Sequence, residues 1–219
     1  MLRPSLLSAL VLGIAGCSAS DTTGDQSRQA AYESYNVARE SAYEDASQGA
    51  ALGTAALNNL AASNSTASMA GAYEMVVASL LSDPIVGEMT MNADFGKGTV
   101  KGNLSNSYID GSPGAHTVDD VAVLTGTVSY SGTIDNDPDV GDAQVVAHGD
   151  GIFTDADTGT GYDLYLDIDG NFYRYGAAGE LIGVTGGFEG NIDVTTDGSA
   201  VLYDIDGDFV VCENTCVSE

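Results

Sequence analysis

The pattern of apolar and polar residues changes near residue 67 of this chain. Beyond that point the two kinds alternate along short segments, and Gly-rich or Asp-rich turns separate the segments about every ten residues. Strict alternation predicts β-strands with one buried face. The strands predicted in this way cover residues 69–78, 88–95, 99–109, 121–134, 143–153, 162–173, 186–194 and 200–211.

These strands, about eight in number, are joined by connections of hairpin length. Such a series suits a closed antiparallel barrel or a sandwich of roughly 145 residues. We therefore expect an all-β fold, an eight-stranded antiparallel barrel over residues 67–211.

A helical pattern precedes the strands. Apolar or aromatic residues recur at spacings of four and three, which traces one face of a helix from Ser27 to about Gln48. The pattern allows the helix to extend to residue 62, although Gly49 and Gly53 disfavour that extension. We assign residues 27–62 as a helical segment, whose face carries Ala31, Tyr35, Ala38, Ala42 and Ala46.

The first residues predict an export signal. A positive start with Arg3 is followed by an apolar run, Leu6 to Ile14, that is too short to span a bilayer. The sequence Ile14-Ala-Gly-Cys17 resembles the bacterial lipoprotein box, in which the signal is removed and the cysteine is lipidated. This resemblance implies a signal over residues 1–16, lipidation of Cys17 and a lipidated tether over 17–26. An ordinary signal peptide that contains a cysteine is the alternative. Ser18 resembles the sorting signal for the outer membrane.

The chain is strongly acidic, with 32 Asp and Glu against 6 Lys and Arg and a formal charge of −26. Without residues 1–16, which include Arg3, five basic and 32 acidic residues remain, a formal charge of −27. Such a charge repels nucleic acid and anionic lipid headgroups, which excludes both as partners. Solubility in a salty habitat is the simplest explanation, and an acid-specific binding role is the alternative.

Two further cysteines lie near the end of the sequence. Cys212 and Cys216 predict a small structural disulfide in an exported protein, within a tail over residues 212–219. A zinc site would need two more soft ligands, and the only histidines are His116 and His148.

The sequence DIDGNF at 167–172 returns as DIDGDF at 204–209, and Asp-x-Asp-Gly strings suggest calcium loops. An EF-hand needs Gly at its sixth position and Glu at its twelfth. Counted from residue 167, those positions hold Phe172 and Ala178. The alternation continues through both copies, which therefore predict strands with their acids outward. Gly170 and Gly207 fall on the apolar faces, where a missing side chain lets a strand bend under an aromatic ring.

Other candidate sites are weaker. Asp135, Asp137 and Asp139 lie in an acidic turn over 135–142, which is a possible metal site but more simply a solvated turn. His148 is a possible haem or metal ligand but more simply a strand residue. Neither histidine has a recognisable Ser or Cys nucleophile near it in the sequence, so we expect no enzyme and no cofactor.

Two segments carry a family resemblance. MNADFGKGTVKGNLSN at 91–106 and GNFYRYGAAGELIGVTGGF at 170–188 resemble the C-terminal β-barrel domain of the transferrin-binding protein B family, and factor H-binding lipoproteins share a related barrel. Arg174 departs from the glycine that the family has there. The resemblance implies a lipoprotein with a barrel of lipocalin size. The residues that match the family's signature hairpin are Phe172, Tyr173, Ala178, Glu180, Gly183 and Phe188.

Together these features predict a non-catalytic lipoprotein of the outer membrane, at the cell surface or on the periplasmic face. Its barrel rim or loops would bind a protein or ligand partner at the cell envelope. One alternative is a haem or small-ligand carrier that uses the barrel mouth, with His148 or a tyrosine as ligand. The other is a purely structural envelope lipoprotein.

Overall fold

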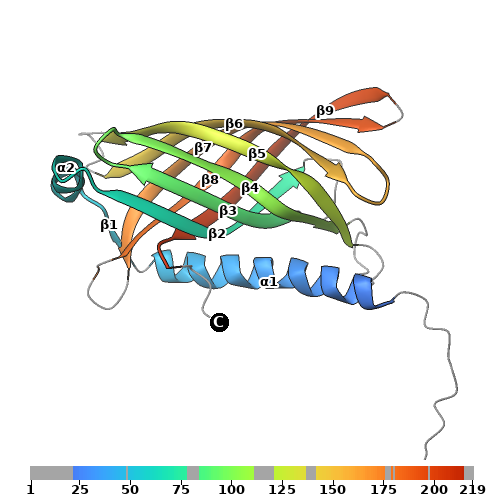
Figure 1. Ribbon diagram of the computed structural model, residues 1–219, viewed down its shortest axis with the longest axis horizontal. Helices are drawn as coiled ribbons and strands as arrows, with labels where there is room; N and C mark the ends of the chain where they lie inside the picture. The colour runs from blue at the N-terminus through green and yellow to red at the C-terminus, as the bar shows by residue number, and fades with distance from the viewer. Residues whose placement is uncertain are drawn as a thin grey trace, which may run out of the picture.

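The computed structural model describes residues 22–47, 49–77, 84–110, 121–136, 142–175, 179, 181–196 and 198–214. Eight antiparallel strands close into a barrel, with one helix lengthwise along the outside and a second helix at one end (Figure 1). Each strand pairs with the next, and the last pairs with the first, which confirms the predicted barrel. The strands are β2 (Thr66–Val77), β3 (Ile85–Asp94), β4 (Thr99–Asp110), β5 (Val121–Asn136), β6 (Ala143–Asp155), β7 (Gly161–Tyr175), β8 (Leu181–Thr196) and β9 (Ser199–Cys212).

The helical segment consists of two helices, α1 (Thr22–Ser47) and α2 (Thr54–Ala62), separated by the short strand β1 (Ala50–Ala51). The interruption comes from tertiary contacts. Leu52 is fully buried, donates its N–H to the Phe172 carbonyl oxygen at 2.9 Å and accepts the N–H of Ala143 at 3.0 Å. Gly53 then takes an extended conformation and caps α2, which packs Leu57 into the end of the barrel. Neither α1 nor α2, the helices of the described part of the chain, is long and apolar enough to cross a bilayer.

Side chains fill the barrel interior. Two of the buried tyrosines among them, Tyr73 and Tyr130, have hydrogen-bond partners inside the protein. The Tyr73 hydroxyl lies 2.5 Å from Ser107 Oγ, and the Tyr130 hydroxyl donates to the Thr90 carbonyl oxygen at 2.7 Å. Burial raises the pKa of both phenols, so both stay neutral at physiological pH. The largest fully buried side chains include Phe153, Phe172, Phe188, Phe209, Leu52, Met75, Ile85, Met89 and Met91.

Glycines permit the barrel strands to bend and to approach one another. Gly170 of β7, Gly186 of β8 and Phe209 of β9 are in register, and the Phe209 ring lies against both glycines. A Cβ would lie 3.0 Å from this ring at Gly170 and 2.8 Å from it at Gly186. At Gly207, a Cβ would overlap the carbonyl oxygen of Glu74 on β2. Both repeated glycines therefore lie where the packing leaves no room for a side chain, and the ring over Gly170 comes from two strands away.

We expect Gly186→Ala to lower the free energy of unfolding by about 1–3 kcal/mol, because the new methyl group overlaps the Asp169 carbonyl oxygen and the Phe209 ring. Chemical denaturation measures the change. Gly187→Ala is the matched control, since Gly187 faces outward and its Cβ would lie 3.2 Å from one carbonyl oxygen. Equal losses in the two variants would contradict this account of the glycine.

Arg39 and two apolar contacts dock helix α1 on the barrel, and Arg28 adds an ion pair with the exposed Asp157. The Arg39 guanidinium lies 2.6 Å from Glu74 Oε2 on β2 and 2.7 Å from Asp208 Oδ1 on β9. Glu74 and Asp208 are directly opposite each other in the β2–β9 pair, where like charges destabilise a sheet. The Arg39 side chain, only 13% exposed, bridges the two carboxylates and offsets one of their two negative charges.

The apolar contacts lie on either side of Arg39 along the helix. Tyr32 is buried against Val86 and Val121, and Ala42 packs with Tyr173 and Val210. Burial raises the pKa of Glu74, although Arg39 partly opposes that rise. The charged form of Glu74 is therefore tolerated at this position because Arg39 is present.

We expect Arg39→Met to lower the free energy of unfolding by about 1–3 kcal/mol, because charge-assisted hydrogen bonds to two carboxylates are lost. The loss grows as pH rises from about 4 to 7. Arg39 lowers the pKa of Glu74, so its removal places the folded-state pKa of Glu74 further above the unfolded value. The variant therefore loses more stability than the unaltered chain as Glu74 ionises. Denaturation at several pH values measures this.

Arg28→Met is the matched control on the same helix. Arg28 pairs with Asp157, whose side chain is 50% exposed, and such exposed pairs contribute at most about 1 kcal/mol. A loss for Arg39→Met that is no larger than the control's, or that does not change with pH, would contradict the proposed role of Arg39.

Candidate functional site

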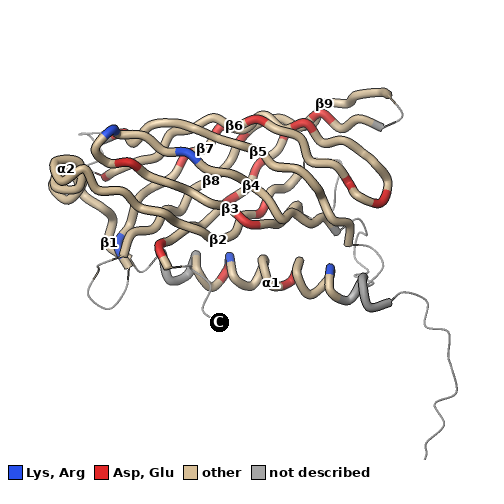
Figure 2. Tube along the Cα trace, viewed as in Figure 1, with Lys and Arg blue, Asp and Glu red and all other residues tan. Residues whose placement is uncertain are grey.

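The outer wall of the barrel has two different halves. On β6–β9 nine of the outward side chains are acidic, and Asp167, Glu189 and Asp206 form one row in register across β7, β8 and β9. This arrangement confirms that both Asp-x-Asp-Gly segments are strands with their acids outward. The few basic positions of the barrel lie toward its α2 end (Figure 2). The other outward acids of this half are Asp150, Asp163, Asp169, Asp193, Asp204 and Asp208.

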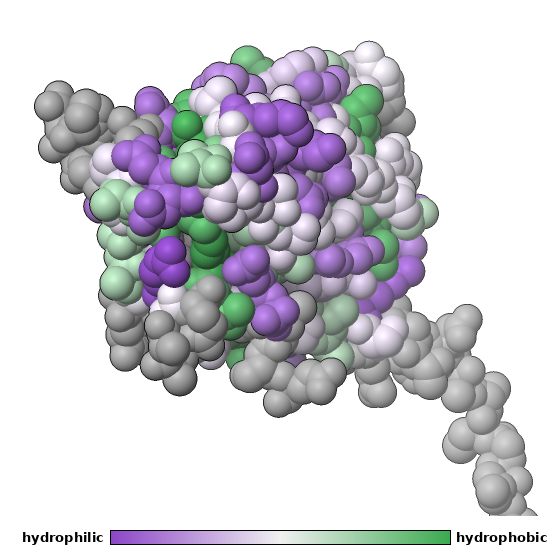
Figure 3. Space-filling view, turned by 60° about the vertical axis from the view of Figure 1, so that its left-hand side comes forward, coloured by the Kyte–Doolittle hydropathy of each residue, from purple (hydrophilic) through white to green (hydrophobic). Residues whose placement is uncertain are grey.

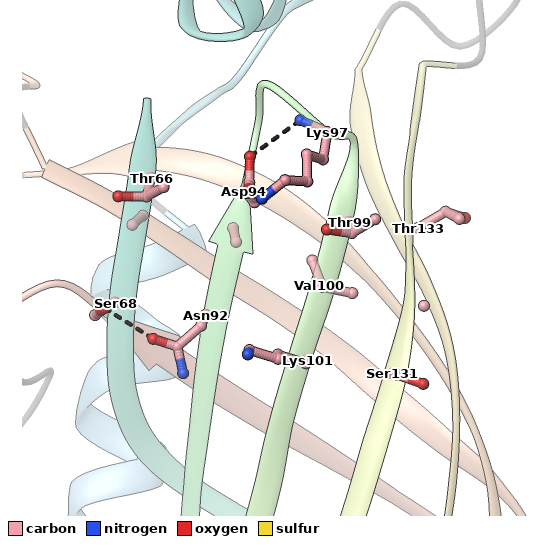
Figure 4. A pocket seen from close by; sticks show the side chains of 13 residues that line it. Thr66, Ser68, Asn92, Asp94, Lys97, Thr99, Val100, Lys101, Ser131 and Thr133 are labelled. Carbon is pink, nitrogen blue, oxygen red and sulfur yellow. Dashed lines mark hydrogen bonds and ion pairs between the residues drawn. The ribbon is translucent and has the colours of Figure 1, made fainter. Parts of the chain in front are cut away.

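A hollow of about 830 Å³ lies in the other half, over β2–β5 (Figure 4). Short hydroxyl and amide side chains line it together with Lys97 and Lys101, and we call it the lysine groove. Seen from the α2 end, hydrophilic and pale residues cover most of the surface, and apolar residues show between them (Figure 3). The groove side chains form two in-register rows, Thr66–Asp94–Thr99–Thr133 and Ser68–Asn92–Lys101–Ser131.

Lys97 belongs to the turn between β3 and β4. Its Nζ lies 2.6 Å from Asp94 Oδ2, and its backbone N–H donates to Asp94 Oδ1 at 3.0 Å. The same side-chain hydrogen bond raises the pKa of Lys97 and lowers the pKa of Asp94. Lys97 is thus engaged within its own turn.

Lys101 stands in the middle of β4, exposed, between the uncharged residues Asn92 and Ser131. Within the described residues, its ammonium group has no ion-pair or hydrogen-bond partner. The Asn92 side-chain oxygen accepts a hydrogen bond from Ser68 Oγ at 2.8 Å, which leaves the amide nitrogen on the other side. Asn92 and Lys101 are in-register neighbours, and Figure 4 shows the Asn92 amide on the β2 side of β3 and the end of Lys101 on its β4 side. The groove therefore presents two neighbouring donors to the outside.

His148 lies on the outer wall of β6 and not in the interior. Its side chain is 76% exposed, and its Nδ1 lies 2.5 Å from Asp167 Oδ1 on β7. A ligand carrier that uses the barrel mouth would need a side chain directed inward, and this histidine is directed away from that space.

The remaining candidates of the sequence are only partly covered by the described residues. Asp135 lies near the end of β5, whereas Asp137 and Asp139 fall outside the described residues. Within those residues, no group of His, Cys, Asp and Glu side chains is placed to hold a metal ion. Cys212 is buried at the end of β9. Its predicted partner Cys216, the lipidation site Cys17 and His116 also fall outside the described residues.

Sequence reasoning missed the lysine groove. Alternation places each groove side chain on an outward face but does not say which strands lie next to one another at which register. One signal was available, since Lys97 and Lys101 are the only lysines of a chain with a formal charge of −26.

No family model matches the chain, and no curated protein matches it either. The resemblance to the transferrin-binding protein B family therefore rests on the residues of segments 91–106 and 170–188 alone.

We expect an amine-reactive acetylating ester to modify Lys101 before Lys97. Asp94 holds the Lys97 amine as an ammonium ion, which is not nucleophilic, and Lys101 has no such partner among the described residues. Peptide mass spectrometry over a time course measures the two rates. Asp94→Asn should bring the rates together, and a Lys97 that reacts first in the unaltered protein would contradict the geometry of the groove.

Proposed function

We propose that this chain is a non-catalytic, lipid-anchored binding protein of the bacterial outer membrane. In this proposal Cys17 carries the lipid, a Cys212–Cys216 disulfide closes the tail, and the barrel binds a partner at the cell envelope through the lysine groove. The lipoprotein box at 14–17 and the family resemblance support the anchor and the location.

One observation carries the binding role. The barrel interior is filled by side chains, while the outer wall has a hollow lined by polar groups from four strands. Binding sites are concave and hold a few convergent polar groups, and the lysine groove has both features. It also contains both lysines of the chain, on the half of the wall that has the fewest acids.

The two lysines make a position-specific experiment possible. A photoreactive diazirine attached by reductive alkylation, which keeps each amine positively charged, labels the full chain, in detergent, at Lys97 and Lys101. Irradiation with an isolated cell-envelope fraction should then attach the partner, protein or glycan, to the groove. Mass spectrometry identifies both the captured material and the labelled residue.

The matched control moves the reactive amine without removing the charge of the groove. Lys97→Arg and Lys101→Arg keep both cations but lose the reactive amines, and Thr195→Lys supplies an amine on the exposed outer wall of β8. We expect this triple variant to capture at most a tenth of the material that the unaltered chain captures. Two results would contradict binding through the groove. One is equal capture by the triple variant and the unaltered chain, and the other is no more capture by the labelled chain than by unlabelled protein.

A further inference from the structure

The donors of the lysine groove indicate what part of a ligand they would bind. Lys101 has an ammonium group with three N–H donors, and its in-register neighbour Asn92 adds an amide nitrogen on the adjacent strand. Two nitrogen donors side by side match an oxygen-bearing anion, and hydrogen bonds to such an anion are roughly twice as strong as neutral ones.

Apart from the Asp94–Lys97 ion pair, the rest of the lining is uncharged and suits hydroxyl groups. Five side chains with hydroxyl groups, from β2, β4 and β5, surround the two donors: Thr66, Ser68, Thr99, Ser131 and Thr133. Each hydroxyl can donate one hydrogen bond and accept others. The two rows lie about 6.8 Å apart and neighbouring strands about 4.8 Å apart, so the polar groups form a regular lattice across four strands. An extended ligand with many hydroxyl groups can pair with several of them at once.

The net charge of the protein limits how many anionic groups the ligand can carry. A densely charged polyanion is repelled by a chain with a formal charge of −26. A ligand with isolated anionic groups among neutral hydroxyls suffers much less repulsion and still reaches Lys101. At about 0.15 M salt the Debye length is about 8 Å, so charges on the far wall are screened while a direct contact is not.

We propose that the lysine groove binds a segment of an extended glycan that carries carboxylate groups, with one carboxylate held between Lys101 and Asn92. The neutral hydroxyls of the sugar units pair with the Ser and Thr side chains of β2, β4 and β5. The inference rests on the proposed binding function and names the class of ligand for that same groove.

Isothermal titration calorimetry of the full chain in detergent, at about 0.15 M salt, tests this inference with oligogalacturonate that is methyl-esterified on most of its units, so that its remaining carboxylates are isolated. The neutral comparison is the fully methyl-esterified form, which has the same backbone and ring hydroxyls without the charge. We expect this oligogalacturonate to bind and the fully methyl-esterified form to bind about tenfold more weakly or worse, because the charge-assisted hydrogen bonds are lost. Lys101→Gln should weaken oligogalacturonate binding by a similar factor, and Lys101→Arg should preserve it.

The control variant is Thr195→Glu, which changes the net charge by the same amount on the outer wall of β8 and should leave binding within about twofold. Three results would overturn the inference: no oligogalacturonate binding, equal binding of the fully methyl-esterified form, or no effect of Lys101→Gln. Displacement of the probe by an equal concentration of inorganic phosphate would also overturn it, since the groove would then take free anions.

These outcomes are separable from failure of the binding function itself. If the photoreactive lysines capture a partner and oligogalacturonate does not bind, only the glycan assignment is wrong. If neither experiment detects binding at the groove, both proposals fail.

Discussion

The pairing of β2 with β9 closes the barrel, and most other features of the molecule depend on it. The ladder runs from the Ala70–Cys212 pair to the Val77–Ile205 pair, so it joins the first and last barrel strands. A closed sheet has no exposed edge and can bury a continuous apolar core. Closure brings the β2 backbone against Gly207 and the Glu74 carboxylate opposite Asp208. The first contact requires a glycine, and the second requires a cation from outside the sheet.

Arg39 supplies that cation, which makes α1 a structural part of the barrel as well as a connection to the N-terminal segment. The helix covers the later half of β2 and the earlier half of β3, where Glu74 and Val86 lie. The lysine groove occupies the opposite ends of the same two strands, at Ser68 and Asn92. The helix and the groove therefore share two strands without overlapping, and a ligand can occupy the groove while α1 stays docked.

Because side chains fill the interior, a ligand would have to bind on the outer wall. The two halves of that wall differ in charge. Rows of like charges such as Asp167, Glu189 and Asp206 are unfavourable between neighbouring strands, but these side chains are exposed and water and salt screen them. The half formed by β2–β5 has few acids and both lysines. The contrast between the halves gives the groove a local positive charge on an otherwise acidic protein.

The local pattern of the sequence by itself determined the eight strands, the outward acids of both Asp-x-Asp-Gly segments and the inward glycines at 170 and 207. Strand alternation depends only on the geometry of the extended chain, so residues two positions apart reveal it. Tertiary structure decided the rest. The break between α1 and α2 comes from Leu52 bonding to Phe172 and Ala143, the cover of Gly170 comes from Phe209, and Arg39 meets Asp208 across 169 residues of sequence. The lysine groove likewise exists only because closure and register bring outward side chains of four strands together. No local pattern contains these contacts, because register between distant segments is set by the packing of the whole barrel.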